Sequence, residues 1–214
     1  MAEDSRAVGS PLVVALGGNA ISDDGDGASV IDRTAAGVAD ATAAGRTVAL
    51  THGNGPQVGR LLRQQERTPD VPGRPLDVLV ARTQADIGYR LQRALDDHLA
   101  GGTDAVTVVT QVVVDADDPA FENPTKPVGP RYTAAEAADR PFPTREVADG
   151  DRGYRRVVPS PEPQAVVERE EVAQLLAEGT HVVCAGGGGV PVVRDGGLRG
   201  VEAVVDKDLT SQVL

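Results

Sequence analysis

The sequence predicts an α/β protein, a three-layer sandwich in which helices cover both faces of a mainly parallel central sheet, with an inserted subdomain. A unit of apolar strand, glycine-rich loop and helix recurs three times, and helices that link strands in this way are the crossovers of a parallel sheet. The chain has 214 residues, 40% of them hydrophobic, which is enough to bury a core. The stretch 115–164 is rich in proline and shows little periodicity, which indicates an ordered insertion.

Short apolar runs rich in β-branched residues predict the strands. They are residues 12–16, 46–51, 105–114, 180–184, 190–193 and 198–205, with a further hairpin at 154–158 inside the insertion. Apolar residues at helical spacing, ended in two cases by Gly45 and Gly179, predict the helices. These are residues 31–44, 61–68, 77–99, 168–177 and a last helix that begins near residue 206.

The charge balance restricts the possible partners. The formal net charge is −11, so the chain repels nucleic acid and anionic lipid, and we expect neither as a partner. No run approaches the roughly 18 apolar residues of a membrane helix, and the acidic opening MAEDSRAVGS differs from a basic leader. The single cysteine, Cys184, excludes an intramolecular disulfide and a multi-cysteine metal site. We therefore expect a cytoplasmic protein.

The choice of charged residues is unusual. Aspartate outnumbers glutamate 21 to 11, and arginine outnumbers lysine 19 to 2. An aspartate-rich surface nearly free of lysine is typical of proteins that work in multi-molar salt, where repulsion between charges is screened. An ordinary acidic protein from a GC-rich genome is the alternative.

The two lysines stand out against this composition. Lys126 lies in a Pro/Gly loop, PTKPVGP, and Lys207 lies between two aspartates where the last helix begins. Neither position is the polar helix face on which a solvated lysine is usual. An ammonium is a compact point charge that a guanidinium does not replace, so we interpret both lysines as functional. The alternative is that both are chance survivors.

Glycine clusters follow three of the predicted strands. Glycine lets successive backbone N–H groups turn toward one point and form a nest for an anion. The candidate phosphate-binding residues are Gly17, Gly18, Asn19, Gly53, Asn54, Gly55, Gly187 and Gly188. Each loop alone could be a tight turn, but three at strand ends, with two lysines, indicate a site for a polyphosphate and a small anion. Neither GxxxxGK[ST] nor a GxGxxG after a strand is present, and no histidine has a partner at metal-ligand spacing, so no metal site is predicted.

Seven motifs, in this order, resemble those of the carbamate kinases within the amino acid kinase superfamily. They are VVALGGNAI, THGNGPQVG, TQADIGY, TQVVVDADDPAFENPTKPVGP, RRVVPSPEP, AGGGGVPVV and GVEAVVDKDL. The resemblance runs from Val13 to Leu214. The PTKPVGP loop and the TQVVVD…DPAF stretch are typical of carbamate kinases and disfavour the superfamily members that act on acetylglutamate, an isoprenoid phosphate or fosfomycin.

The resemblance implies reversible phosphoryl transfer between ATP and carbamate, giving carbamoyl phosphate and ADP, with Mg²⁺, in a homodimer that serves fermentative arginine breakdown. Lys207 would bridge the transferred phosphoryl group and the leaving oxygen, and Asp208 would orient the cationic groups. Lys126, from the protruding subdomain at about 115–164, would neutralise charge on the carbamate and the phosphoryl group. The glycine loops, with Asn19 and Asn54, would donate hydrogen bonds to both. Such an active site needs no nucleophilic side chain.

Two features depart from the family. Carbamate kinases continue beyond the DKDL helix with a nucleotide-binding part that holds most of the adenine and ribose pocket and a further lysine, so the resemblance implies that residues 1–214 are an N-terminal portion. Arg82 stands where a smaller or apolar residue is usual. The alternative to an active enzyme is therefore a catalytically silent chain of the same fold that binds anions or forms a dimer.

Overall fold

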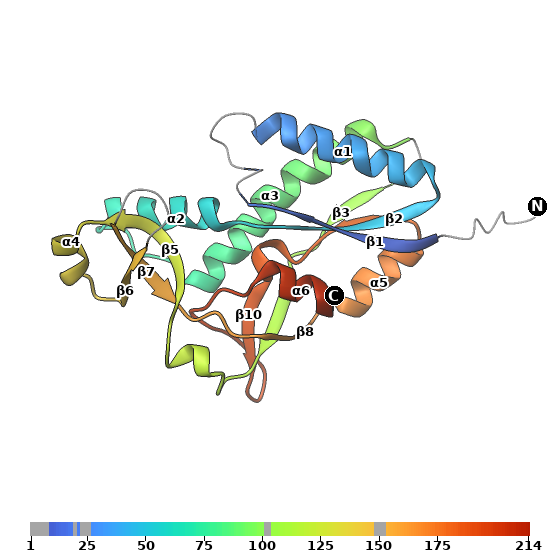
Figure 1. Cartoon of the computed structure of the whole chain (residues 1–214). Coiled ribbons are helices and arrows are strands. Elements are labelled where there is room, and N and C mark those ends of the chain that lie inside the picture. Colours follow the sequence, from blue (N-terminus) through green and yellow to red (C-terminus); the bar gives the residue numbers. More distant parts are fainter. Residues whose placement is uncertain (1–8, 19–20, 22–26, 101–103, 148–152) are drawn as a thin grey trace, which may run out of the picture.

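The computed structural model describes residues 9–18, 21, 27–100, 104–147 and 153–214 (Figure 1). The elements are, in chain order, β1 (Gly9–Leu16), α1 (Gly27–Ala43), β2 (Arg46–His52), α2 (Gly55–Arg67), α3 (Leu76–His98), β3 (Ala105–Thr107), β4 (Gln111–Val114), η1 (Pro119–Phe121), β5 (Lys126–Tyr132), α4 (Ala134–Ala138), β6 (Thr144–Val147), β7 (Gly153–Val158), β8 (Pro163–Val166), α5 (Arg169–Ala177), β9 (His181–Val183), η2 (Gly186–Gly188), β10 (Val190–Arg194), β11 (Leu198–Gly200) and α6 (Lys207–Val213). None of the described helices is both long and apolar enough to cross a membrane.

The main sheet has four strands in the order β1-β2-β9-β3, and each neighbouring pair is parallel. Strand β9 inserts between β2 and β3, although more than 70 residues separate it from β3 in the sequence. Because the strands are parallel, their carboxyl ends lie at one edge, and the loops that follow β1, β2 and β9 meet there. The predicted parallel sheet is confirmed.

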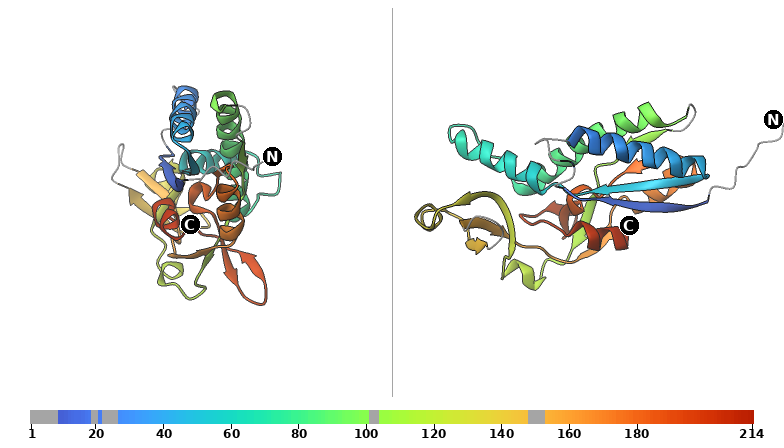
Figure 2. Two further views of the ribbon diagram at one scale, coloured as in Figure 1. Left: turned by 90° about the vertical axis from the view of Figure 1, so that its right-hand side faces the viewer. Right: turned by 45° about the horizontal axis from the view of Figure 1, so that its top comes forward.

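Helices cover both faces of the main sheet, with α1 and α3 on one side and α5 on the other (Figures 1 and 2). Neighbouring residues of β2 point to opposite layers, because side chains alternate along a strand. Leu50 packs in a buried cluster with Ile87 and Leu91 of α3. Ala49 packs in another cluster with Val172 of α5. The three-layer arrangement is therefore confirmed.

The apolar run 105–114 forms two strands in different sheets, so the prediction of one strand was wrong. Between the two strands, the buried side chain of Gln84 on α3 forms hydrogen bonds with the Thr110 backbone in place of a neighbouring strand. Its Oε1 accepts from the Thr110 N–H at 2.9 Å, and its Nε2 donates to the Thr110 carbonyl at 3.0 Å. These bonds satisfy a buried backbone that has left the main sheet, and β4 then joins the second sheet.

The second sheet has the order β11-β10-β4-β8, with β4 and β10 parallel and the outer pairs antiparallel. The prediction of a strand over 198–205 was wrong beyond Gly200, where β11 ends. After that point the backbone bonds to other segments: the Val204 N–H donates to the Pro159 carbonyl at 3.1 Å. The chain therefore passes next to the end of β7 before α6 begins.

Helix α2 begins at Gly55, so the prediction of a start near residue 61 was wrong. Pro56 occupies the first turn, where its fixed φ suits a helix and its missing N–H costs no hydrogen bond. The first intrahelical bond runs from the Val58 N–H to the Asn54 carbonyl at 2.9 Å. The N-terminus of α2 therefore follows β2 almost directly.

Within the stretch 115–164, β5, β7 and β6 form a three-stranded antiparallel sheet in that order. This sheet and α4 extend to one side of the molecule (Figure 2, right). Their outer end is attached to α2: the hydroxyl of Tyr132 donates to Glu66, and the Arg140 guanidinium lies over the Tyr132 ring. Burial and this carboxylate raise the pKa of Tyr132 above its usual value.

Two histidines buried beside the main sheet make stability depend on pH. Burial lowers the pKa of His181 and of His52. His181 accepts a hydrogen bond from the Val48 N–H at Nδ1, 3.0 Å away, and this bond requires an unprotonated nitrogen. The unfolded chain takes up protons as pH falls through the usual value of about 6.5, whereas the folded chain takes them up only at lower pH.

The free energy of unfolding is therefore expected to fall as pH is lowered from 6.5 to 5.5, by up to about 1.4 kcal/mol per pH unit for each histidine. Urea unfolding of the chain and of His181→Gln, at constant KCl, measures the slope, and the variant should lose part of it. Equal slopes for the two proteins would contradict the prediction. His98→Gln, at an exposed position paired with Asp32, is the matched control.

Candidate active site

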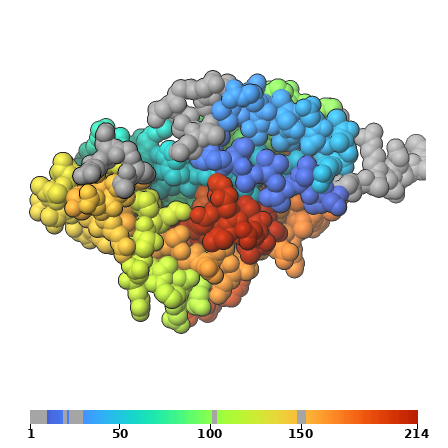
Figure 3. Space-filling view, in the orientation of Figure 1, coloured from blue at the N-terminus to red at the C-terminus, as the bar shows by residue number. Residues whose placement is uncertain are grey.

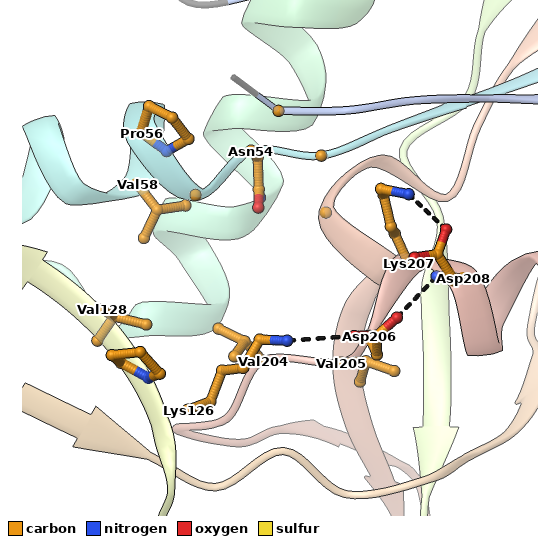
Figure 4. Close-up of a pocket in the computed structure, with 15 residues that line it drawn as sticks. Asn54, Pro56, Val58, Lys126, Val128, Val204, Val205, Asp206, Lys207 and Asp208 are labelled. Atoms are coloured by element: carbon orange, nitrogen blue, oxygen red, sulfur yellow. Dashed lines mark hydrogen bonds and ion pairs between the residues drawn. The ribbon is translucent and has the colours of Figure 1, made fainter. Parts of the chain in front are cut away.

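A pocket of about 290 Å³ lies where the carboxyl ends of the main strands meet the three-stranded sheet (Figure 4). Its walls come from the loops after β1 and β2, the first turn of α2, β5, the η2 turn and the segment that leads into α6. The lining residues are Gly18, Gly53, Asn54, Gly55, Pro56, Val58, Lys126, Pro127, Val128, Gly187, Val204, Val205, Asp206, Lys207 and Asp208. Both lysines of the chain line this one pocket.

The loops after β1 and β2 touch through their backbones. A Cβ on Gly53 would lie 2.6 Å from the Gly18 nitrogen and 2.8 Å from its Cα. The Gly53 N–H donates to the Leu16 carbonyl at 2.9 Å, which extends the pairing of the two strands by one step. Only glycine allows this approach, so the backbone itself forms one wall of the pocket.

Asn54 precedes α2 and is held in place from behind. It is 8% exposed, and its Nδ2 donates to the Thr83 hydroxyl at 2.9 Å, which in turn donates to the Val80 carbonyl at 2.8 Å. Its side chain points into the pocket (Figure 4). It lies against Gly187, since a Cβ at that residue would overlap the Asn54 amide. Thr83 of the TQADIGY motif thus supports the site without lining it.

The η2 turn has left-handed backbone angles and brings Gly187 into the wall of the pocket. Ala185 has φ 49° and Gly187 has φ 65°, both in the left-handed region. Hydrogen bonds hold the turn at both ends: the Ala185 N–H donates to the Thr110 hydroxyl at 2.6 Å, and the Thr210 hydroxyl of α6 donates to the Gly188 carbonyl at 2.9 Å. Two segments that lie far apart in the sequence therefore fix the position of this loop.

The two lysines approach from opposite walls, Lys126 from β5 and Lys207 from the first residue of α6 (Figure 4). Lys126 Nζ lies 3.1 Å from Asp206 Oδ2, and Lys207 Nζ donates to the Asp208 carboxylate. Asp206 also caps α6, because its Oδ1 accepts from the Asp208 N–H at 2.9 Å. Each ammonium is thus held by one carboxylate.

The pKa of Asp206 reflects these contacts. Burial acts to raise it, but hydrogen bonds from the Asp208 N–H and from Lys126 outweigh burial and hold the pKa below its usual value. Asp206 is therefore ionised at neutral pH, and Lys126 keeps an anionic partner. We had no prediction for Asp206 as a site residue, although its position beside Lys207 in the sequence DKD was a usable signal.

Two predicted site residues, Gly17 and Gly188, do not line the pocket. Asn19 lies outside the described residues. Gly17 follows β1 but is not part of the wall, and Gly188 packs with its Cα against the carbonyl of Val205. Sequence reasoning gave no role to the supporting residues Gln84 and Thr110, although their places in the motifs TQADIGY and TQVVVD were a usable signal.

The site suits a phosphoryl group better than a resident metal ion. Close backbone approach, a helix N-terminus and two ammonium groups are the usual parts of an anion site. Among the described residues no group of three histidine, cysteine or acidic side chains could hold a metal. Mg²⁺ commonly binds through one or two carboxylates together with substrate phosphates, and Asp206 and Asp208 are the carboxylates present.

The three-stranded sheet projects to one side of the body, and α6 lies at the surface beside β1 (Figure 3). Cys184 is 1% exposed, and burial raises the pKa of its thiol to about 12. A thiol in this state is not a nucleophile, and Cys184 packs in a buried cluster with Ala49 and Val182.

Comparison with known proteins identifies the family. The amino acid kinase family matches residues 10–214. Carbamate kinase from Halobacterium salinarum is 50% identical over 213 residues, which are 96% of this chain and 69% of that protein. Carbamate kinase from Pyrococcus furiosus is 45% identical over 97% of this chain and 71% of its own length.

Solved structures agree with these relatives. Carbamate kinase from Giardia lamblia bound to AMP-PNP superposes with a TM-score of 0.83 and 40% identity, covering 96% of this chain and 69% of that one. The chain thus spans about 70% of the length of the proteins that it matches. From its motifs, its fold and these relatives, the chain belongs to the amino acid kinase family, in its carbamate kinase branch.

Proposed function

We propose that this pocket carries out the carbamate kinase reaction, the reversible transfer of a phosphoryl group between ATP and carbamate that gives carbamoyl phosphate and ADP. The observation that carries the proposal is the placement of Lys126 and Lys207 on opposite walls of one glycine-lined pocket, in a chain with only two lysines. In the direction of ATP formation, the bond between phosphorus and the carbamate oxygen breaks. A bond to the terminal oxygen of ADP forms in its place.

Each part of the pocket has a role in this transfer. Lys207 donates to the transferred phosphoryl group and the leaving oxygen, and Lys126 neutralises charge on the carbamate. Gly55 offers a backbone N–H group at the N-terminus of α2, where the helix dipole favours an anion. Gly18 and Gly53 form the adjoining backbone wall of the pocket. Asp206 and Asp208 orient the two ammonium groups. No proton moves and no covalent enzyme intermediate forms, so positioning and charge neutralisation account for catalysis.

ATP or ADP is the second substrate. Mg²⁺, when bound with the nucleotide phosphates, would supply positive charge for the transfer. The structure of carbamate kinase from Giardia lamblia bound to AMP-PNP supports nucleotide binding in this branch. Asp206 and Asp208 are the residues that would hold the metal on this side of the pocket.

We also propose a cytoplasmic homodimer that works in fermentative arginine breakdown, with the stretch 115–164 as a protruding subdomain. Two apolar side chains of α3, Val78 and Tyr89, are 36% and 60% exposed and support a contact between subunits. The excess of aspartate and arginine supports operation in high salt.

The test is ATP formation from carbamoyl phosphate and MgADP by the 214-residue chain in multi-molar KCl. ATP above the uncatalysed background, with saturation in both substrates, would support the proposal and show that these 214 residues suffice for the transfer. A folded chain that forms no ATP and shows no saturable affinity for MgADP would contradict the proposal. That result would instead favour the alternative of a silent chain that binds anions or dimerises.

A further inference from the structure

The carboxylate of Glu202 connects two elements that flank the active site. Its Oε1 accepts a hydrogen bond from the Leu76 N–H at 2.8 Å, and its Oε2 accepts from the Arg156 guanidinium at 2.9 Å. Leu76 is the first residue of α3, and Pro75 before it has no side-chain cap to offer. Glu202 therefore caps α3 and binds β7 with the same carboxylate.

Arg156 belongs to the sheet that carries the first lysine. In the pairing of β5 with β7, Val128 lies opposite Arg156 and Lys126 lies opposite Val158. The guanidinium lies 5.0 Å from the centre of the Phe142 ring, which holds it against the same sheet. A displacement of Arg156 would therefore also shift Lys126, because the β5–β7 ladder connects the two residues.

Glu202 itself belongs to the segment that carries the second lysine. It precedes Asp206 by four residues and Lys207 by five. Between them, Ala203 and Val205 are buried, and the Val204 N–H donates to the carbonyl after β7. These contacts hold residues 202–207 in place, so a shift of Glu202 would also displace Lys207.

The helix that Glu202 caps completes the connection. Helix α3 carries Thr83 and Gln84, which support Asn54 and the Thr110 backbone behind the pocket. The far end of the three-stranded sheet is attached to α2 through Tyr132 and Glu66. The Arg156–Glu202 pair holds the end nearest the pocket.

We propose that Glu202 is a positioning residue of the phosphoryl-transfer site, which through Arg156 sets the separation of Lys126 from Lys207. This inference rests on the function proposed above. Phosphoryl transfer depends on the placement of charge, and a misplacement of about 1 Å can lower a rate by about 100-fold. The pair is partly exposed, with side-chain exposures of 22% for Arg156 and 52% for Glu202, so it contributes little to global stability. The role of the pair is to keep Lys126 and Lys207 at their relative positions.

The kinetic test uses Glu202→Gln, Arg156→Gln and the double variant in the full chain. Glu202→Gln keeps an oxygen that can accept from the Leu76 N–H but loses the charge that binds Arg156. We expect kcat for ATP formation to fall by about 10- to 100-fold with KM for carbamoyl phosphate nearly unchanged. The double variant should lose no more than the worse single variant, because both changes remove one interaction. Additive losses, or an unchanged kcat, would overturn the proposal.

Asp32→Asn is the matched control, since it replaces a carboxylate paired with His98 far from the pocket. It should leave kcat and KM unchanged.

A distance measurement tests the geometry without activity. Cys184 is the only cysteine and is buried, so spin labels attach selectively to new cysteines at the exposed positions Ala135 on α4 and Glu171 on α5. Pulsed electron paramagnetic resonance should give a narrow distance distribution in the labelled parent chain. It should broaden or shift in Glu202→Gln and Arg156→Gln but not in Asp32→Asn. An unchanged distribution in both variants would overturn the inference. A labelled parent that makes no ATP would count against the proposed function only, because the distances still report on the pair.

Discussion

Replacement of Lys207 by arginine is expected to lower ATP formation from carbamoyl phosphate and MgADP by at least about 100-fold, the scale of losing one donor to developing charge. Arginine keeps the positive charge, so the loss of activity would come from the different shape of its side chain. A guanidinium is a planar fork that binds carboxylates in pairs of hydrogen bonds. At position 207 it has Asp206 and Asp208 beside it and would be drawn toward them, away from the phosphoryl group. Lys126→Arg is expected to lose activity to a similar extent, through Asp206.

Initial rates at saturating substrates and titration with carbamoyl phosphate measure the effect. The unfolding midpoint should stay close to that of the parent chain, because Lys126 is only partly buried and Lys207 lies at the first turn of α6. Arg63→Lys, an exchange of the same two residue types at an exposed position of α2, is the control and should be neutral. Near-normal rates in both lysine variants would show that the ammonium groups are not required.

Gly53→Ala is expected to lower the transfer rate by up to about 100-fold although it changes no functional group. The new Cβ would lie 2.6 Å from the Gly18 nitrogen and 2.8 Å from its Cα. Both are backbone atoms that no rotamer change can move, so the loops after β1 and β2 must separate. The backbone N–H groups of the pocket would then no longer converge on one point. Overpacking of this kind also lowers the free energy of unfolding, typically by about 1–3 kcal/mol.

Rates and urea unfolding of the variant separate these two effects, since the rate is measured well below the unfolding midpoint. Gly197→Ala is the matched control, because a Cβ there meets nothing within 4 Å and the residue lies outside the pocket. It should retain full activity. A Gly53→Ala chain that transfers at the parent rate would mean that the contact between the two loops does not shape the site.

Much of the architecture could be predicted because hydrophobic periodicity acts locally. Strands β1 and β2 and helices α3 and α5 begin and end within a few residues of their predicted bounds, and their order along the chain implies a parallel sheet. The same order predicts that the glycine loops gather at one edge. Two of the errors lie where a segment distant in sequence determines the local backbone. The division of 105–114 depends on Gln84, and the end of β11 depends on bonds to the residue after β7.

The sequence by itself determined the chemistry of this protein: two lysines in an arginine-rich chain, three glycine clusters at strand ends, and the motifs of a carbamate kinase. Only the tertiary structure decided which groups meet. Lys126 and Asp206 are 80 residues apart in the sequence and 3.1 Å apart in space. The Arg156–Glu202 pair that accompanies them joins two motifs, RRVVPSPEP and GVEAVVDKDL, whose contact only the tertiary structure shows. Residue type sets what a side chain can do, and this can be read locally. The distance between two side chains depends on the packing of every layer between them.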